Sequence, residues 1–165
     1  MDEKETLKIF EEVGRLCVSW SFLEVVTEAA IWGLLDIDDT LAPLITWNKD
    51  LEQRGKLIVE HGTLKHPSEE EALKKFNTGL RAVIQDRNII VHGAVHKNES
   101  RPPCWTVWRG VGKGKNFPTS SDAAHIVRTN IDKLADQLRA FNARHNYGRT
   151  SRLSDQIEND WPKPL

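Results

Sequence analysis

The sequence predicts a mainly α-helical protein, a four-helix up-down bundle with a β-hairpin or extended excursion between the third and fourth helices. Apolar residues recur in alternating steps of three and four over four stretches, as on the buried face of a helix. Acidic residues, proline and glycine stand at the ends of these stretches. One segment with an alternating, β-prone pattern separates the last two stretches and predicts the excursion.

Composition predicts one soluble domain, because 165 residues can bury a core and the chain is 39% hydrophobic and 28% charged. A net charge of −1 excludes a general attraction to nucleic acid, so any such binding needs a local basic patch. Cys17 and Cys104 are too few for a disulfide framework, which suits the cytoplasm. The acidic N-terminus lacks the apolar core of a signal peptide, and polar residues interrupt the apolar stretch 16–35, so no membrane association is expected.

The first helix is expected over residues 4–35, where an acidic run and then Pro43 end it. The second helix is expected from about residue 48 to Gly62, which would stop it. The residues expected on the inward faces are Val13, Cys17, Trp20, Glu24, Thr27, Ile31 and Leu34 on the first helix, and Leu51, Leu57 and Ile58 on the second.

The third helix is expected to start at Pro67, because the glutamates that follow favour the positive end of the helix dipole. It runs to about residue 92, and Gly93 is the expected C-cap. The fourth helix is expected to start near Ser121. The expected inward faces are Leu73, Phe76, Leu80, Val83, Arg87 and Ile90 on the third helix, and Ile126, Ile131, Leu134, Leu138 and Phe141 on the fourth.

Residues 94–118 form the expected excursion, because the stretch CWTVWRG alternates while KNESRPP and GKGKNFP are rich in turn-forming residues. Residues 146–165 are polar and are expected to form a C-terminal tail, in which Trp161 could dock on the rest of the protein. The predicted organisation is therefore a helical domain over residues 1–145 followed by this tail.

Two charged residues, Glu24 and Arg87, fall on inward helix faces. A buried charge needs a partner, so we expect the two to meet inside the bundle or at a dimer face. One interpretation is a salt bridge that fixes the helix register. The other is functional, because Asn88 and His92 follow and share a helix face. Arg87 and His92 lie about 140° apart on a regular helix, so they converge only in a distorted last turn or between two subunits.

The residues DRNIIVHG at 86–93 resemble the signature of the HEPN superfamily (higher eukaryotes and prokaryotes nucleotide-binding domains), in which a histidine follows an arginine after four to six residues. The stretches SWSFLE and IWGLL, and VHG before the hairpin, are similar to a branch found in small bacterial proteins. The resemblance covers roughly residues 10–142. The signature also matches at 54–61 and 139–145, but only at Arg87 does asparagine follow the arginine, on an inward face and before a terminal glycine.

The resemblance implies a metal-independent endoribonuclease that works as a homodimer, with both copies of the motif lining one cleft. His92 would act as general acid or base, and Arg87 would stabilise charge on the phosphate. Asn88 would orient the histidine or the phosphate, and Glu24 would hold Arg87 in place. Such a protein could be a toxin or phage-defence effector with an antitoxin or nucleotidyltransferase partner. The alternative is a non-catalytic HEPN-like module for dimerisation, nucleotide binding or partner binding.

The excursion could supply the path for RNA. It carries four basic residues and no acidic residue between positions 101 and 115, namely Arg101, Arg109, Lys113 and Lys115. Trp105 and Trp108 lie between them, and basic groups with aromatic faces suit single-stranded nucleic acid. The alternative is that the tryptophans pack on the bundle and the lysines belong to a solvated turn.

Neither a metal nor a cofactor is expected. The stretch GVGKGKNF lacks the spacing of a phosphate-binding loop, and DIDD lacks the glycine and distal glutamate of a calcium loop. His92 and His96 have the spacing of metal ligands, but Gly93 ends the helix between them and no third ligand is near in sequence.

Overall fold

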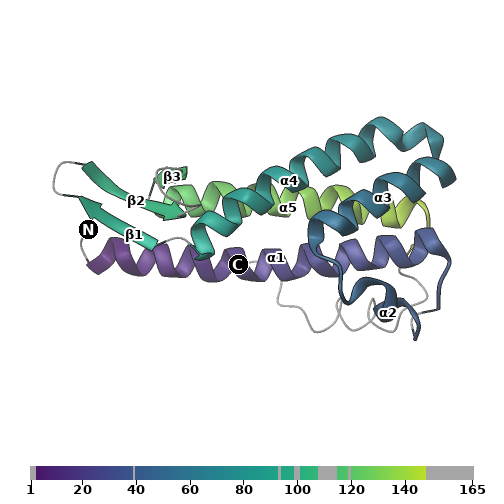
Figure 1. The fold of residues 1–165 in the computed structure, drawn as a ribbon, viewed down its shortest axis with the longest axis horizontal. Coiled ribbons are helices and arrows are strands. Elements are labelled where there is room, and N and C mark those ends of the chain that lie inside the picture. Colours follow the sequence, from purple (N-terminus) through teal and green to yellow (C-terminus); the bar gives the residue numbers. More distant parts are fainter. Residues whose placement is uncertain are drawn as a thin grey trace. The chain divides into compact units, whose positions relative to one another are not determined.

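The computed structural model describes residues 3–38, 40–92, 94–98, 101–107, 115–118 and 120–147. Its helices are α1 (Glu3–Leu35), α2 (Ala42–Thr46), α3 (Leu51–Lys65), the short 3-10 helix η1 (Pro67–Glu69), α4 (Glu70–His92) and α5 (Ser121–Arg144), shown in Figure 1. The predicted mainly α-helical class is therefore confirmed. The up-down arrangement of four helices and the hairpin stay predictions.

The backbone between α4 and α5 contains three short extended segments, β1 (Ala94–Asn98), β2 (Arg101–Val107) and β3 (Lys115–Pro118). They pair antiparallel in the order β1-β2-β3. Thr106 in the middle strand is opposite Ala94 on one side and Asn116 on the other.

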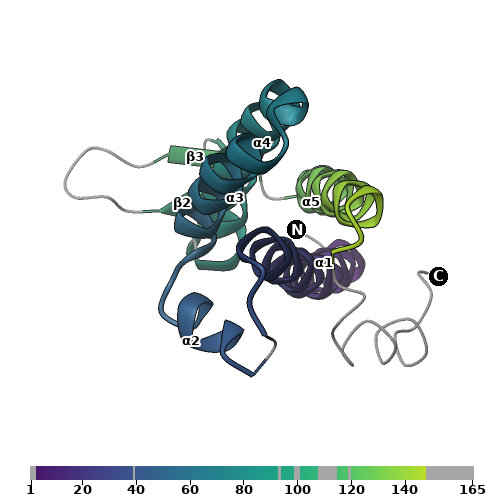
Figure 2. The same ribbon diagram turned by 90° about the vertical axis from the view of Figure 1, so that its right-hand side faces the viewer.

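The chain divides into two compact units. The first unit contains Met1–Leu23 and Thr78–Leu134, and the second contains Glu24–Asn77 and Ala135–Leu165. The helices α1, α4 and α5 each contribute residues to both units, and Figure 2 views α5 nearly along its axis.

The first unit has an aliphatic core. Its largest side chains with almost no exposed surface are Leu16, Leu23, Leu80, Ile90, Val127 and Ile131. α4 approaches α5 closely, because a Cβ atom at Gly79 would lie 3.0 Å from Cδ2 of Leu134. The prediction that Ile126 faces inward is wrong, since its side chain is 58% exposed. Ala124 and Val127 occupy the buried side of α5, and Ile126, one position earlier than Val127, is rotated away from it.

The second unit corrects one expected helix boundary and contains a short helix that was not predicted. α3 does not stop at Gly62 but continues to Lys65, and Gly62 is buried within it. A Cβ atom at Gly62 would lie 2.5 Å from Cδ1 of Leu73, so this glycine allows close packing instead of ending the helix. Pro43 was expected only to break a helix, but it also lies in the first turn of the short helix α2, where its missing N–H has no partner to lose.

The start of α3 offers a test of local stability. The Asp50 carboxylate accepts a hydrogen bond from the Gln53 N–H at 2.8 Å, and the Gln53 side chain accepts one from the Asp50 N–H at 3.1 Å. Replacing Asp50 with alanine should lower the free energy of unfolding by about 1 kcal/mol, measured by urea denaturation, because it removes this capping box. Asp50→Asn is the matched control, since asparagine caps a helix equally well. An equal loss in both variants would contradict the capping role.

α1 is long enough and apolar enough to cross a membrane by composition. The core helix of a soluble protein and a signal sequence pass the same test. This property of α1 therefore does not decide where the protein resides.

Candidate functional site

The three central residues of the candidate site lie in the last two turns of α4. Arg87 and Asn88 are half-buried, and His92, the last residue of the helix, is exposed. Between them Ile89 and Ile90 are buried and fix this end of α4 to the first unit. Gly93, the expected C-cap, lies outside the described residues.

Arg87 contacts both of the other site residues within one chain. Its Nη1 donates to Oδ1 of Asn88 at 3.1 Å and lies 3.1 Å from Nε2 of His92. A regular helix sets the directions of Arg87 and His92 about 140° apart, but the long arginine side chain spans that separation. The two residues therefore meet on one helix.

The contact defines which nitrogen of His92 carries a proton. A guanidinium group has only hydrogen-bond donors, so Nε2 of His92 must be the acceptor in this geometry. In the neutral ring the proton then belongs to Nδ1. The lone pair of Nε2 is held by the Arg87 N–H at the exposed end of the helix, and it becomes free to act as a general base when the guanidinium moves onto another acceptor.

Trp20 supports the guanidinium from a second helix. The Cζ atom of Arg87 lies 4.9 Å from the centre of a Trp20 ring, and Trp20 is only 8% exposed. This distance permits a cation–π interaction. Within the described part of the chain, the buried Nε of Arg87 has no hydrogen-bond partner. The sequence placed Trp20 and Arg87 on inward helix faces, which was the available signal, but it did not pair them.

The other predicted site residues are not joined to this group by described contacts. Glu24 is half-buried on α1 and belongs to the second unit, so its pairing with Arg87 stays a prediction. Arg101 and Lys115 lie on β2 and β3, and their side chains are outside the description. Arg109 and Lys113 also lie outside the described residues.

The two competing matches to the arginine–histidine signature have structural partners. Arg54 forms an ion pair with Glu28 at 2.9 Å. Arg139 forms one with Asp136 at 3.6 Å, and His145 stacks on another histidine ring. These contacts pair Arg54, Arg139 and His145 with residues outside the signature, whereas Arg87 contacts the histidine of its own match directly.

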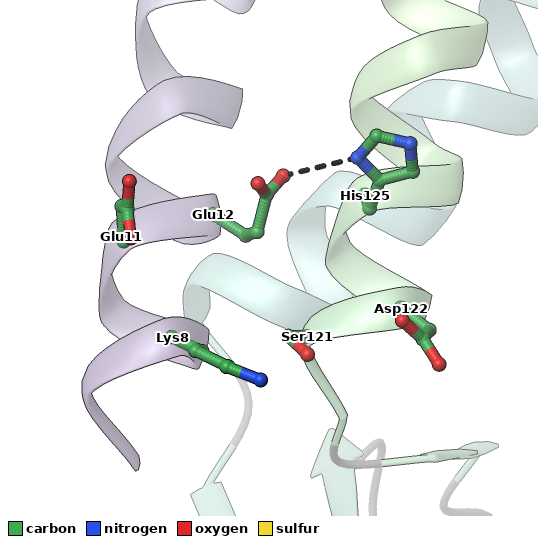
Figure 3. A pocket seen from close by; sticks show the side chains of 6 residues that line it. All are labelled: Lys8, Glu11, Glu12, Ser121, Asp122 and His125. Carbon is green, nitrogen blue, oxygen red and sulfur yellow. Dashed lines mark ion pairs between the residues drawn. The ribbon is translucent and has the colours of Figure 1, made fainter. Parts of the chain in front are cut away.

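A separate polar pocket of about 160 Å³ lies in the first unit, and Figure 3 shows its lining residues Lys8, Glu11, Glu12, Ser121, Asp122 and His125. Serine, histidine and glutamate are the residue types of a hydrolase triad. The Ser121 hydroxyl, however, donates to Glu5 at 3.1 Å. His125 Nδ1 lies 2.9 Å from the Arg128 guanidinium and 3.4 Å from Glu12. These partners indicate a helix cap and an ion-pair network, not an activated nucleophile.

Among the described residues, no group of three or more histidine, cysteine, aspartate or glutamate side chains is placed to hold a metal ion. Comparisons with protein-family models, curated proteins and solved structures found no match. The function is therefore argued from the residues of this chain.

Proposed function

We propose that the protein is a metal-independent endoribonuclease of the HEPN type and that Arg87, Asn88 and His92 are its reacting groups. The observation that carries the proposal is the 3.1 Å contact between Nη1 of Arg87 and Nε2 of His92 at the exposed end of α4. A phosphate-binding cation beside a histidine whose lone pair is freed when a phosphate takes the cation is the minimum that RNA transesterification needs. RNA itself supplies the nucleophile, its 2′-hydroxyl group.

The proposed reaction assigns one step to each group. The phosphate first draws Nη1 of Arg87 away from His92, and the freed Nε2 of His92 takes the proton of the 2′-hydroxyl as the 2′-oxygen forms a bond to phosphorus. The Arg87 guanidinium then donates to the phosphate oxygens, where negative charge accumulates, and Asn88 keeps the guanidinium oriented. The bond from phosphorus to the 5′-oxygen breaks, and this oxygen receives a proton from water or from a second copy of the motif. The products carry 2′,3′-cyclic phosphate and 5′-hydroxyl ends.

We further propose the finer architecture that the resemblance implies. Residues 1–145 form an up-down bundle of four helices, in which the excursion is a hairpin that carries RNA on its basic residues. Two chains form a homodimer that brings both motifs to one cleft, and Glu24 helps to hold Arg87. The protein acts in the cytoplasm as a toxin or phage-defence effector, controlled by an antitoxin or a nucleotidyltransferase.

A second candidate function is a non-catalytic module for binding or dimerisation. The packing of Arg87 on Trp20 favours this function, because an aromatic face under the guanidinium is what a structural arginine requires. In that case the contact with His92 would only order the end of α4.

The test that separates the two functions is incubation of the purified protein with mixed RNA in excess EDTA. A metal-independent nuclease should cleave the RNA and leave 2′,3′-cyclic phosphate ends, because its reaction uses only side chains and the 2′-hydroxyl. Cleavage that stops when EDTA is added, or products with 3′-hydroxyl ends, would contradict the proposal. Intact RNA would favour the binding module.

A further inference from the structure

Three aromatic side chains of the second unit meet at the end of α5. His66 follows α3, and His145 and Tyr147 follow α5. The two histidine rings stack with centres 3.6 Å apart and planes inclined by 26°. Nε2 of His66 lies 2.6 Å from the hydroxyl oxygen of Tyr147, which is 81 residues further along the chain. Phe141 packs its ring edge-on against His66 at 5.9 Å.

Tyr147 also fits against the backbone of α1. A Cβ atom at Gly33 would lie 2.3 Å from Cγ of Tyr147, so the ring occupies the space that any other residue would fill. The Tyr147 N–H donates to the Asn142 carbonyl at 2.8 Å, and Asn146 before it adopts the left-handed conformation with φ of 58°. These contacts turn the chain back after α5 and hold Tyr147 on Gly33.

Burial and the neighbouring charges disfavour protonation of His66. Burial lowers the pKa of His66 first, and the nearby His145 and Lys65 lower it further, while Glu69 opposes them. Glu69 is 3.7 Å from Nε2 of His145, but it already accepts two hydrogen bonds of 3.1 Å from Arg144. One shared carboxylate therefore faces two imidazoles and two permanent cations.

The Tyr147 phenol keeps the proton that it needs in order to donate to His66. Burial, and then the charge of Asp36, raise the pKa of Tyr147, so its phenol keeps its proton. With His66 neutral, the phenol can donate to Nε2. Lys65 Nζ donates to the Gly33 carbonyl at 3.2 Å and lies 5.8 Å from the centre of the tyrosine ring. Lys65 therefore contacts both Gly33 and the ring that packs on it.

We infer that His66, His145 and Tyr147 form an acid-sensitive latch, in which Tyr147 is held on Gly33 while His66 is neutral and is released when His66 takes up a proton. A proton on His66 turns Nε2 from the acceptor of the tyrosine hydrogen bond into a donor, and it places a positive charge in a partly buried site against the stacked His145 and near Lys65. Release would free the point from which the polar C-terminal residues continue. This inference does not depend on the proposed nuclease function.

The direction of the pH dependence follows from the lowered pKa of His66. Because the pKa of His66 is lower in the folded protein than its usual 6.5, the unfolded chain binds more protons at this position. The stabilisation by the latch is therefore complete above about pH 6.5. It is lost as the pH falls through the lowered value.

The latch can be observed directly because the chain contains one tyrosine. Protein labelled with ring-¹³C tyrosine should give one ring signal in NMR, and this signal should move from a buried to a solvent-like position as the pH falls from about 8 to about 5. His66→Gln should keep the buried position throughout, because glutamine can still bond the phenol and does not titrate. Gly33→Ala should give the solvent-like position even at high pH.

His125→Gln is the matched control, because His125 is an exposed histidine in the first unit. The tyrosine signal of this variant should change with pH as it does in the wild type. A wild-type signal that does not move over this pH range would overturn the latch. The latch would also be overturned if the tyrosine signal of His66→Gln changed with pH as in the wild type. A loss of helix content, measured by circular dichroism, together with the change of the tyrosine signal would overturn it as well. The wild-type titration decides the question even if a variant fails to fold. No RNA is present, so the result is separate from the test of nuclease activity.

Discussion

Replacing His92 with alanine should lower the rate of RNA cleavage by about 10²–10⁴-fold, because it removes the proposed proton-transfer group. The melting temperature should change little, since His92 is exposed and ends its helix. The measurement is the initial rate of cleavage of a labelled RNA in excess EDTA. Added imidazole should restore part of the activity, because it can enter the space left by the side chain and accept the proton.

The matched control for this experiment is His125→Ala. His125 is also an exposed histidine on a helix of the first unit, but its partners are Arg128 and Glu12. This variant should cleave RNA at the wild-type rate. If His92→Ala also cleaved at the wild-type rate, His92 could not be the general base, and the proposed chemistry would fail.

Replacing Trp20 with alanine should have the largest effect on stability, a loss of about 3–5 kcal/mol in the free energy of unfolding. The Trp20 side chain is almost fully buried, so its removal leaves a large cavity in the first unit. It also removes the aromatic face under the Arg87 guanidinium, which adds about 0.5–2 kcal/mol to the cost. Since small domains are stable by about 5–15 kcal/mol, urea denaturation should show the shift clearly.

Two milder variants separate packing from support of the guanidinium. Trp20→Phe keeps an aromatic face, whereas Trp20→Leu keeps only apolar volume. Both should fold, and the phenylalanine variant should retain more RNA cleavage per folded molecule, because Arg87 still rests on a ring. Equal cleavage rates in the two variants would show that the ring does not position Arg87.

The long helices could be predicted because each has a continuous apolar face and recognisable ends. The third helix was expected to end at about residue 92, and α4 ends at His92. The wrong boundary at Gly62 and the missed helix at Pro43 arose because one residue type can have two physical meanings. Gly62 resembles a helix end in the sequence, and only its packing against Leu73 shows otherwise. Pro43 breaks one helix and starts the next.

The grouping of residues at the candidate site could be predicted in part. Arg87 stood out because a charged residue on an inward helix face needs a partner, and His92 followed at a helix end. Their contact could not be predicted, because helix periodicity gives the direction of a side chain and not its reach. The contact between His66 and Tyr147 depends on the packing of α3 against the end of α5, and no local pattern predicts it.

The two supports of Arg87 have a consequence for ligand binding. A free arginine side chain loses about 2 kcal/mol of rotamer entropy when it becomes fixed. In this protein the indole of Trp20 and the amide of Asn88 already restrict the guanidinium. This rotamer entropy is therefore lost when the protein folds, and not when a phosphate binds. An anion that displaces His92 from Nη1 would therefore bind a preorganised group, and the strength of binding would depend on the rigidity of α4 as much as on charge.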